Sequence, residues 1–131
     1  MRKNKTMKKN KTFISNPTGN EISCVMYGVE DKILNDYKLI KKSLLDGLKK
    51  DKFNILKSSE HKFKPQGYTI CVLLAESHAA LHTYPEYGSL VFYLYSCRKE
   101  GDGKITLLHL LENLKPKKKK IIQRVIKVKD I

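Results

Sequence analysis

The chain has 131 residues, with 27 Lys and Arg against 13 Asp and Glu, a formal net charge of +14 and 40% hydrophobic residues. This length is that of one domain with a real core, and the composition excludes fibrous and wholly disordered classes. The longest purely apolar run, residues 70–75, is far shorter than the roughly 20 residues that a membrane-spanning helix needs. Three unevenly spaced cysteines do not make a closed disulfide framework, so we expect reduced thiols in a cytoplasmic protein.

The positive charge is concentrated at the two ends of the chain. Residues 1–11 carry six Lys or Arg and residues 115–129 carry eight, without any acidic residue, and together they equal the whole net charge. Such segments bind phosphate backbones or acidic partners, or they simply stay solvated. No recognition helix, zinc-finger spacing or aromatic–basic interleaving accompanies them. We therefore expect a solvated surface, with a basic protein that binds nucleic acid or an acidic partner as an alternative.

The first half of the chain predicts a strand, a helix and two further strands. Residues 1–20 lack periodicity and contain a turn sequence, so they are predicted to be a flexible basic lead-in to one domain over residues 21–131. Residues 22–27 are β-prone, and apolar residues at helical spacing over residues 31–48 predict an amphipathic helix. Residues 53–56 and 68–74 are predicted strands with a turn between them.

The second half predicts a loop, a strand, a helix and a last strand. Residues 76–88 are a compact polar stretch, and residues 89–97 are apolar on both faces of a predicted strand. A Gly-Asp-Gly turn precedes a helix over residues 105–114, which Pro116 ends, and residues 121–128 are β-prone. The order β-α-β-β-β-α-β predicts an α+β, two-layer sandwich in which two helices cover one face of a mostly antiparallel sheet.

Four polar side chains in and beside the polar stretch are candidates for chemistry: Ser77, His78, His82 and Cys97. Taken singly, each has an ordinary structural interpretation, such as a turn serine, a structural loop histidine or an inert buried thiol. His78 and His82 could ligate a metal with Cys97 if the stretch were helical, but no further Cys or carboxylate stands at ligand spacing, and we expect no metal. Generic chemistry ends here, at a Ser/His/Cys cluster of unknown purpose.

Three separated blocks agree with one family in residue type and in spacing. They are His-Lys-Phe-x-Pro-Gln-Gly at residues 61–67, Ala-Glu-Ser-His-x-x-x-His-Thr-Tyr-Pro-Glu-Tyr-Gly at residues 75–88, and Cys97, twenty positions after Ser77. This arrangement resembles the prokaryotic S-adenosylmethionine decarboxylase family, pyruvoyl-dependent enzymes of polyamine synthesis. The match is dense over residues 58–97, rests on element order elsewhere, and does not cover residues 1–20. Three blocks together are much more specific than one short motif.

The resemblance implies a proenzyme that cuts its own peptide bond between Glu76 and Ser77. Ser77 Oγ would attack the preceding carbonyl carbon, and loss of the Ser77 α-proton would then release Glu76 and leave a dehydroalanine that becomes a pyruvoyl group. The products would be a β chain, residues 1–76, and an α chain, residues 77–131. Because an uncatalysed acyl shift is unfavourable, we expect a strained peptide at this bond.

The resemblance also implies the roles of four further residues. His82 would move protons during processing, since an imidazole both takes and gives a proton near neutral pH. Cys97 would give a proton to the substrate carbon after carbon dioxide leaves, while the pyruvoyl carbonyl formed from Ser77 would make a Schiff base with the substrate amino group. Phe63 would stack on the adenine of S-adenosylmethionine, and Glu86 would hold its ribose hydroxyls.

The chain departs from the family pattern at Tyr84, where many relatives carry Trp, whereas Thr69 keeps a hydroxyl that relatives commonly have. Because Tyr84 concerns the substrate and not processing, a related pyruvoyl decarboxylase acting on ornithine or arginine stays an alternative. The expected product is decarboxylated S-adenosylmethionine, the aminopropyl donor for spermidine. Relatives of this short form assemble as dimers of cleaved protomers, and we expect a homodimer here too.

Overall fold

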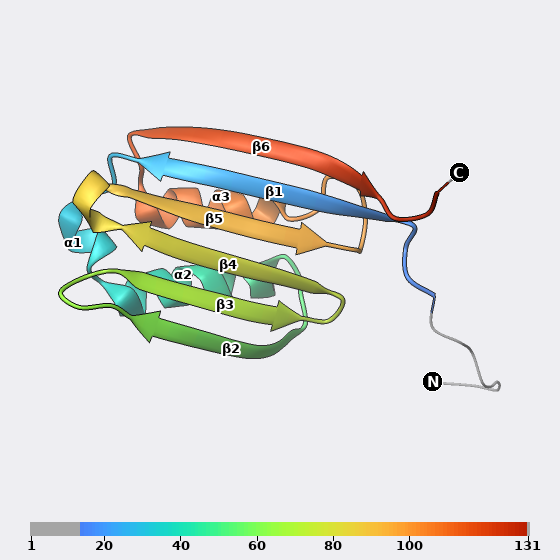
Figure 1. Ribbon diagram of the computed structural model, residues 1–131, viewed down its shortest axis with the longest axis horizontal. Coiled ribbons are helices and arrows are strands. Elements are labelled where there is room, and N and C mark those ends of the chain that lie inside the picture. Colours follow the sequence, from blue (N-terminus) through green and yellow to red (C-terminus); the bar gives the residue numbers. More distant parts are fainter. Residues whose placement is uncertain (1–13, 131) are drawn as a thin grey trace.

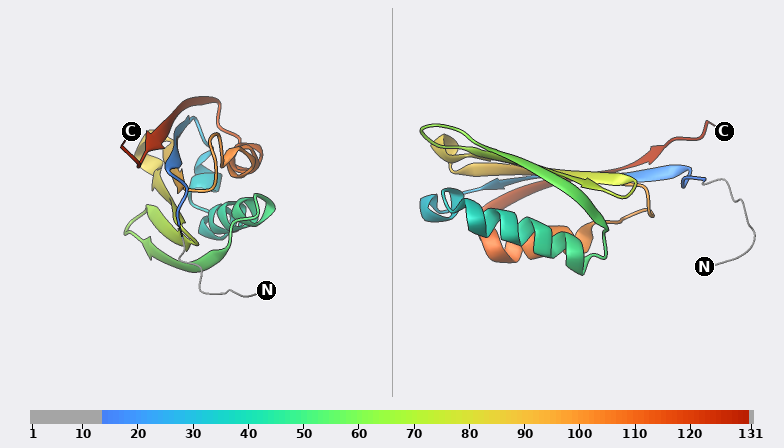
Figure 2. Two further views of the ribbon diagram at one scale, coloured as in Figure 1. Left: turned by 90° about the vertical axis from the view of Figure 1, so that its right-hand side faces the viewer. Right: turned by 90° about the horizontal axis from the view of Figure 1, so that it is seen from below.

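One antiparallel sheet of six strands forms the centre of the molecule, with two long helices on one of its faces (Figures 1 and 2). The computed structural model describes residues 14–130, so most of the predicted basic lead-in lies outside the described residues. The strand order is β2-β3-β4-β5-β1-β6. The predicted α+β class, with a two-layer arrangement and helices on one face, is confirmed. No helix within the described range is long and apolar enough to span a lipid bilayer.

The strands and helices follow each other along the chain with short connections. The strands are β1 (Thr18–Tyr27), β2 (Ile55–Lys62), β3 (Tyr68–Leu74), β4 (Ser77–Tyr84), β5 (Ser89–Ser96) and β6 (Lys118–Lys127). The helices are α1 (Asp31–Leu34), α2 (Tyr37–Lys50) and α3 (Lys104–Leu114), with a 3-10 turn η1 at Pro85–Tyr87. Every neighbouring pair of strands is antiparallel.

Strand β4 is the element that the sequence prediction lacked, because residues 76–88 were interpreted as a polar loop. Ser77 and Thr83 are polar residues on its buried side, and His78 and His82 stand on the other side, so the strand shows no apolar alternation. Its pairing with both β3 and β5 stabilises it instead. The observed order is therefore β-α-β-β-β-β-α-β, with a short α1 before the first long helix.

Several predicted boundaries also move. Strand β1 begins at Thr18, so the sheet already starts inside the segment predicted to be lead-in. The single predicted helix over residues 31–48 is divided at Asp36, whose side chain accepts a hydrogen bond from the Leu39 N–H (3.1 Å) and caps α2. Strand β2 begins later and runs further than predicted, because this edge strand is mostly exposed and polar and gives no apolar pattern.

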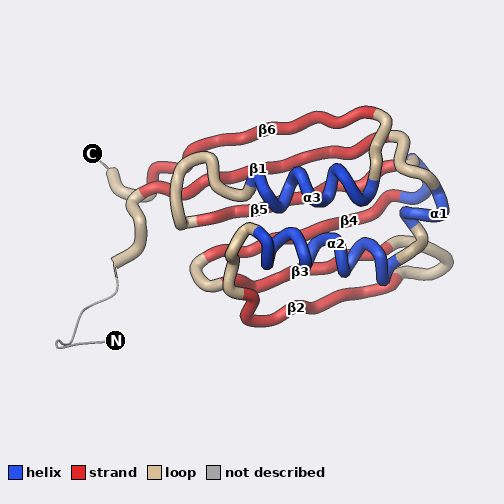
Figure 3. Tube along the Cα trace, turned by 180° about the vertical axis from the view of Figure 1, so that it is seen from behind, coloured by secondary structure: helices blue, strands red, loops and turns tan. Residues whose placement is uncertain are grey.

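The hydrophobic core fills the space between the sheet and the helices α2 and α3 (Figure 3). Buried residues alternate along the strands and recur at helical spacing in α2 and α3, including Ile22, Met26, Ile70, Val72, Phe92, Leu94, Ile40, Leu44, Leu107 and Leu110. Gly47 lets the helices approach closely, since a Cβ there would lie 3.3 Å from both the His109 Cβ and the Thr106 carbonyl oxygen. This packing fixes the sheet on which the functional side chains stand.

The opposite face of the sheet carries no helix, and we call it the open face; it is the near side in Figure 1. The strand register arranges its residues in rows that cross the sheet. The row nearest the β3–β4 turn contains Lys57, Leu73, His78, Tyr95, Glu21 and Arg124, the central row contains Ser59, Cys71, Ala80, Tyr93, Ser23 and Ile122, and the row beyond it contains His61, Thr69, His82, Val91, Val25 and Lys120.

Candidate active site

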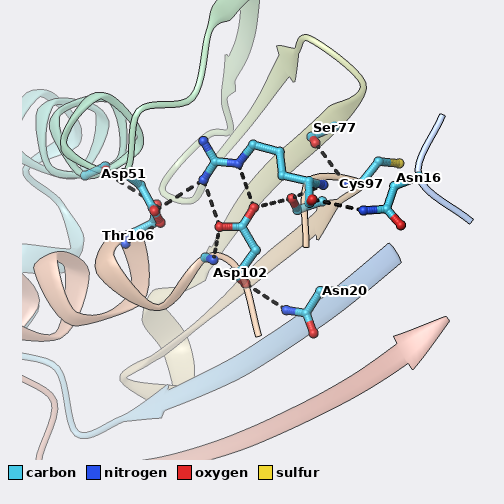
Figure 4. A network of polar contacts seen from close by, with 11 residues as sticks. Asn16, Asn20, Asp51, Ser77, Cys97, Asp102 and Thr106 are labelled. Atoms are coloured by element: carbon cyan, nitrogen blue, oxygen red, sulfur yellow. Dashed lines mark hydrogen bonds and ion pairs between the residues drawn. The ribbon is translucent and has the colours of Figure 1, made fainter. Parts of the chain in front are cut away.

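Ser77 and Cys97 are neighbours at one end of the sheet. Ser77 opens β4 directly after the turn that connects it to β3, and it is 6% exposed. Cys97 follows the last residue of β5 and is half-buried. The backbone N–H of Cys97 donates a hydrogen bond to Ser77 Oγ at 3.3 Å (Figure 4). The fold thus brings together the two residues at which the sequence placed bond cleavage and proton donation.

The peptide bond before Ser77 follows a residue in the left-handed region of backbone space. Glu76 has a φ of 62° in the two-residue β3–β4 turn. For a residue with a Cβ this conformation costs about 1–2 kcal/mol, which is why glycine is common at such positions. Glu76 supplies the carbonyl carbon of the Glu76–Ser77 bond. The expected strain of that peptide bond stays a prediction, because a positive φ describes rotation within Glu76 and not the planarity of the bond.

His82 stands apart from the pair formed by Ser77 and Cys97. A strand rises about 3.3 Å per residue, so His82 lies about 16 Å along β4 from Ser77. Successive side chains also alternate between the faces, which puts His82 on the open face and Ser77 on the helix-covered one. His82 Nδ1 lies 3.0 Å from the Oγ1 of Thr69, its partner on β3. A direct contact between Ser77 and His82 is therefore not formed within one chain.

Phe63 and Glu86 lie at the opposite end of the sheet from Ser77. Phe63 follows β2, is half exposed, and packs edge-on against His61 with ring centroids 4.5 Å apart. Glu86 is an exposed residue of η1. The β2–β3 connection and η1 are both at the left end of the sheet in Figure 1, whereas the β3–β4 turn is at the right end. The elements that carry Phe63 and Glu86 thus lie at the same end of the sheet, and both are far from Ser77.

The metal alternative required a helical segment that carries both histidines. His78 and His82 instead lie on a strand, about 13 Å apart along it, which is too far for both to ligate one ion. Within residues 14–130 no group of three His, Cys, Asp or Glu side chains is placed to hold a metal ion. The helical arrangement that a ligand set of His78, His82 and Cys97 would need is therefore not formed.

A polar cluster on the open face beside Cys97 was missed by the sequence analysis. The Glu21 carboxylate accepts hydrogen bonds from the Tyr93 hydroxyl and from Arg124 at 2.6 and 2.8 Å. These bonds, Tyr93 first, lower the pKa of Glu21, while burial and Glu21 raise the pKa of Tyr93 to about 12. The His78 ring lies 5.8 Å from that of Tyr93 and 5.9 Å from that of Tyr95. Tyrosines at alternate positions of an apolar strand were the available signal.

Comparisons with known proteins agree with this fold. A family model described as S-adenosylmethionine decarboxylase matches residues 20–125. Two curated relatives are both named S-adenosylmethionine decarboxylase proenzyme. The one from Brevibacillus brevis is 35% identical over 100 residues, covering 76% of this chain and 75% of the relative. The one from Methanococcus maripaludis is 33% identical over 100 residues, covering 76% and 82%.

Solved structures show the same architecture. The crystal structure of the adenosylmethionine decarboxylase from Aquifex aeolicus superimposes with a TM-score of 0.75 at 26% identity, covering 89% of this chain and 95% of that one. A Trypanosoma brucei AdoMetDC monomer, at 15% identity and a TM-score of 0.59, shares the fold. The molecule is thus an α+β sandwich with a buried serine at a hairpin turn and a cysteine beside it. The chain belongs to the S-adenosylmethionine decarboxylase family.

Proposed function

We propose that this protein is a pyruvoyl-dependent S-adenosylmethionine decarboxylase that matures by cutting itself between Glu76 and Ser77. Membership of the family supports the reaction class. The observation that carries the proposal is the contact between Ser77 Oγ and the Cys97 N–H, directly after a turn residue with a left-handed backbone. The product would be decarboxylated S-adenosylmethionine, which serves as the aminopropyl donor for spermidine.

Self-cleavage would use the Ser77 side chain and the peptide bond directly before it. Ser77 Oγ bonds to the Glu76 carbonyl carbon while the Glu76–Ser77 C–N bond breaks and the nitrogen takes up a proton, which leaves an ester. Loss of the Ser77 α-proton then breaks the Cβ–Oγ bond and releases Glu76 as a carboxylate. The remaining dehydroalanine takes up water and loses ammonia to leave a pyruvoyl group. Glu76 is exposed, so its new carboxylate is released into water.

The site fits this prosthetic group because the group would be made from the Ser77 side chain itself. When formed, the pyruvoyl group supplies an electron-withdrawing carbonyl that accepts the electrons released with carbon dioxide. Cys97 contributes through two atoms. Its N–H bonds to Ser77 Oγ, which becomes the leaving oxygen during cleavage, and a fixed donor stabilises charge that develops there. Its half-buried thiol would donate the proton to the substrate carbon.

A second copy of the chain would complete this site, because His82, Phe63 and Glu86 lie at the other end of the sheet. Consider two open faces packed together about a two-fold axis that runs across the strands between the two sheets. The His82 side chain of each chain then faces the β3–β4 turn of the other, in a self-complementary contact. It approaches the backbone of the Glu76–Ser77 bond, whereas the Ser77 side chain is on the helix-covered side. The open face suits such a contact, since Leu73 and Ile122 are more than half exposed on it. A groove of about 250 Å³ between β2, β3 and β4 also opens there.

Within such a homodimer, Thr69 orients the histidine. Its hydroxyl is paired with His82 Nδ1 at 3.0 Å, so Nε2 is the ring nitrogen left to move protons at the partner's cleavage site. The thiol of Cys97 must stay reduced to act as an acid, and all three cysteines are free. We therefore place the enzyme in the cytoplasm, where thiols are kept reduced.

Intact-mass measurement on freshly purified protein tests the proposal. We expect two chains that break between residues 76 and 77, and one unbroken chain for the Ser77→Ala control. Borohydride should add a hydride and a proton to the carbonyl of the α chain. Carbon dioxide release from S-adenosylmethionine, ornithine and arginine, each offered alone, then identifies the substrate. A wild-type chain that stays whole under native conditions would refute the proposal, and release from ornithine or arginine alone would replace its substrate.

A further inference from the structure

A buried carboxylate, Asp102, binds both residues that flank Cys97. Asp102 is 2% exposed and accepts hydrogen bonds from the Ser96 hydroxyl and from the guanidinium of Arg98, at 2.7 Å for Nε and 2.8 Å for Nη2. The Arg98 N–H in turn donates to Ser96 Oγ at 3.2 Å. One carboxylate therefore closes a ring of contacts around the cysteine (Figure 4).

Asp102 is itself anchored to other parts of the fold. Its carboxylate accepts from the Gly103 N–H at 3.0 Å, and its carbonyl accepts from the Asn20 amide on β1 at 2.7 Å. Arg98 lies 3.6 Å over the ring of Phe53. Burial alone would raise the pKa of Asp102, but the hydrogen bonds from Arg98 and Ser96 and the Arg98 charge outweigh it, so the pKa lies below its usual value. The carboxyl group is thus charged whenever the protein works.

Cys97 lies beyond the paired residues of the sheet, so its position depends on the contacts that Asp102 makes on either side of it. The paired residues of β5 end with Ser96, opposite Asn20, so the chain leaves the sheet at Cys97. The Cys97 N–H bond to Ser77 Oγ, at 3.3 Å, is already at the long end of the hydrogen-bond range, and a small shift would break it. A displacement of about 1 Å in a reacting group can cost about 100-fold in rate.

We infer that Asp102 and Arg98 are a positioning pair that sets Cys97 against Ser77, and so controls both the rate of self-cleavage and the placement of the thiol. The inference rests on the proposed function. Thr106 belongs to the same network without touching Ser96 or Arg98 itself: it donates to Asp51 from its N–H at 3.0 Å and from its hydroxyl at 2.8 Å. Asp51 in turn accepts from Arg98 Nη2 at 3.3 Å, so Thr106 lies one contact further from Cys97 than Asp102 does. Thr106 supplies a matched control, since it is equally buried.

The test compares the cleavage rates and melting temperatures of Asp102→Asn, Ser96→Ala and the control Thr106→Val. Asp102→Asn keeps the shape of the side chain, and we expect its cleavage to slow by roughly 10- to 100-fold. Ser96→Ala should slow cleavage less, in the same direction. Thr106→Val should lose stability but cleave at close to the wild-type rate. Once matured, Asp102→Asn should show a lower kcat at an unchanged KM, because the buried Asp102 is not among the residues expected to bind substrate.

The outcomes separate a positioning role from a merely structural one. If Asp102→Asn and Thr106→Val slow cleavage equally for an equal loss of stability, the inference is overturned. If Asp102→Asn does not fold, the comparison of Ser96→Ala with Thr106→Val decides in the same way. Failure of the proposed function is a different result, since the wild-type chain would then stay uncleaved, and the inference would fall with it.

Discussion

The two ends of the sheet are prepared for different tasks. At the β3–β4 turn, the Cys97 N–H donates a hydrogen bond to Ser77 Oγ and a buried network holds the residues beside Cys97, so the bond to be cut and this donor belong to the same chain. At the η1 end, Phe63 and Glu86 are exposed and His82 is oriented on the open face. The first end suits a reaction of the chain with itself. The second suits contacts that come from outside, with a substrate and with a second copy.

The largest effect is expected when His82 and Ser77 are mutated in separate chains and the two chains are then combined in one dimer. His82→Ala alone should stay uncleaved, because each Ser77 then faces a partner without the imidazole. When it is co-expressed with Ser77→Ala, mixed dimers pair an intact Ser77 with an intact His82, and the His82→Ala chain should be cleaved. Intact mass distinguishes the two variants and shows which chain is cut.

Two results would break this comparison of the ends. Cleavage of His82→Ala on its own at the wild-type rate would remove His82 from processing. Mixed dimers that form, as shown by differently tagged chains purifying together, but that stay uncleaved would mean that His82 acts within its own chain. The second result would require a large distortion of β4, because Ser77 and His82 lie about 16 Å apart along that strand.

The next effect distinguishes the role of the Cys97 backbone N–H from that of its thiol. Cys97→Ala keeps the backbone N–H on Ser77, so self-cleavage should persist. The variant loses the acid, and general acid catalysis contributes about 100- to 10,000-fold, so kcat should fall by that amount. Intact mass measures the first property and carbon dioxide release the second. Loss of both together would contradict a division of labour between the N–H and the thiol.

The sequence predicted the residues at the Ser77 end of the sheet. It did not predict how that end lies relative to the His82 end. Ser77 and Cys97 were found through their motif spacing, and their contact agrees with it. The separation of His82 from Ser77 depends on residues 77–84 being a strand, and polar residues on both of its faces concealed that. Without β4, the sequence could predict neither that Ser77 and His82 lie on opposite faces of the sheet nor how far apart they are along the strand.

The Asp102 network was beyond the sequence for another reason. It depends on a turn that returns Asp102 to Ser96 and Arg98, and this turn needs glycines at positive φ, 71° at Gly101 and 99° at Gly103. A Cβ on Gly103 would lie 2.3 Å from Leu94 Cδ2 in the core. The Gly-Asp-Gly sequence predicted a turn, but its long-range partners follow from packing, which no local pattern records.

A smaller effect is expected at the second end, on substrate binding alone. Phe63→Ala removes an aromatic platform, and stacking on a base is worth about 1–3 kcal/mol, so KM should rise by roughly 5- to 150-fold. Phe63 is half exposed, and the melting temperature should hardly change. Tyr87→Ala, an exposed aromatic residue of η1, is the matched control and should leave KM as it is. Equal KM values for the two variants would exclude Phe63 from binding.

A more modest effect concerns stability against pH at the first end. The pKa of Asp102 is lowered in the folded state, so its contribution is fully present above the unfolded value of about 3.9 and is lost as pH falls through the lower, folded value. The wild type should therefore melt above Asp102→Asn near neutral pH, and the gap should narrow below about pH 4. Thermal melts from pH 7 to pH 3 measure it. A gap that stays constant would deny that the carboxylate charge stabilises the fold.

The smallest effect is expected from removing residues 1–11, which carry six of the excess cations. The described residues begin at the Ser77 end of the sheet, where the Asn16 side-chain amide donates to the Arg98 carbonyl at 3.0 Å, and the deletion leaves that contact in place. No residue to which we give a role in cleavage or binding lies within residues 1–11, and charges outside the site act through screened potentials, so kcat/KM should change by less than about twofold at physiological salt. Steady-state kinetics at low and high salt measure this. A large loss would make the basic segment part of the active site, whereas unchanged kinetics with weaker retention on immobilised RNA would give it a separate task.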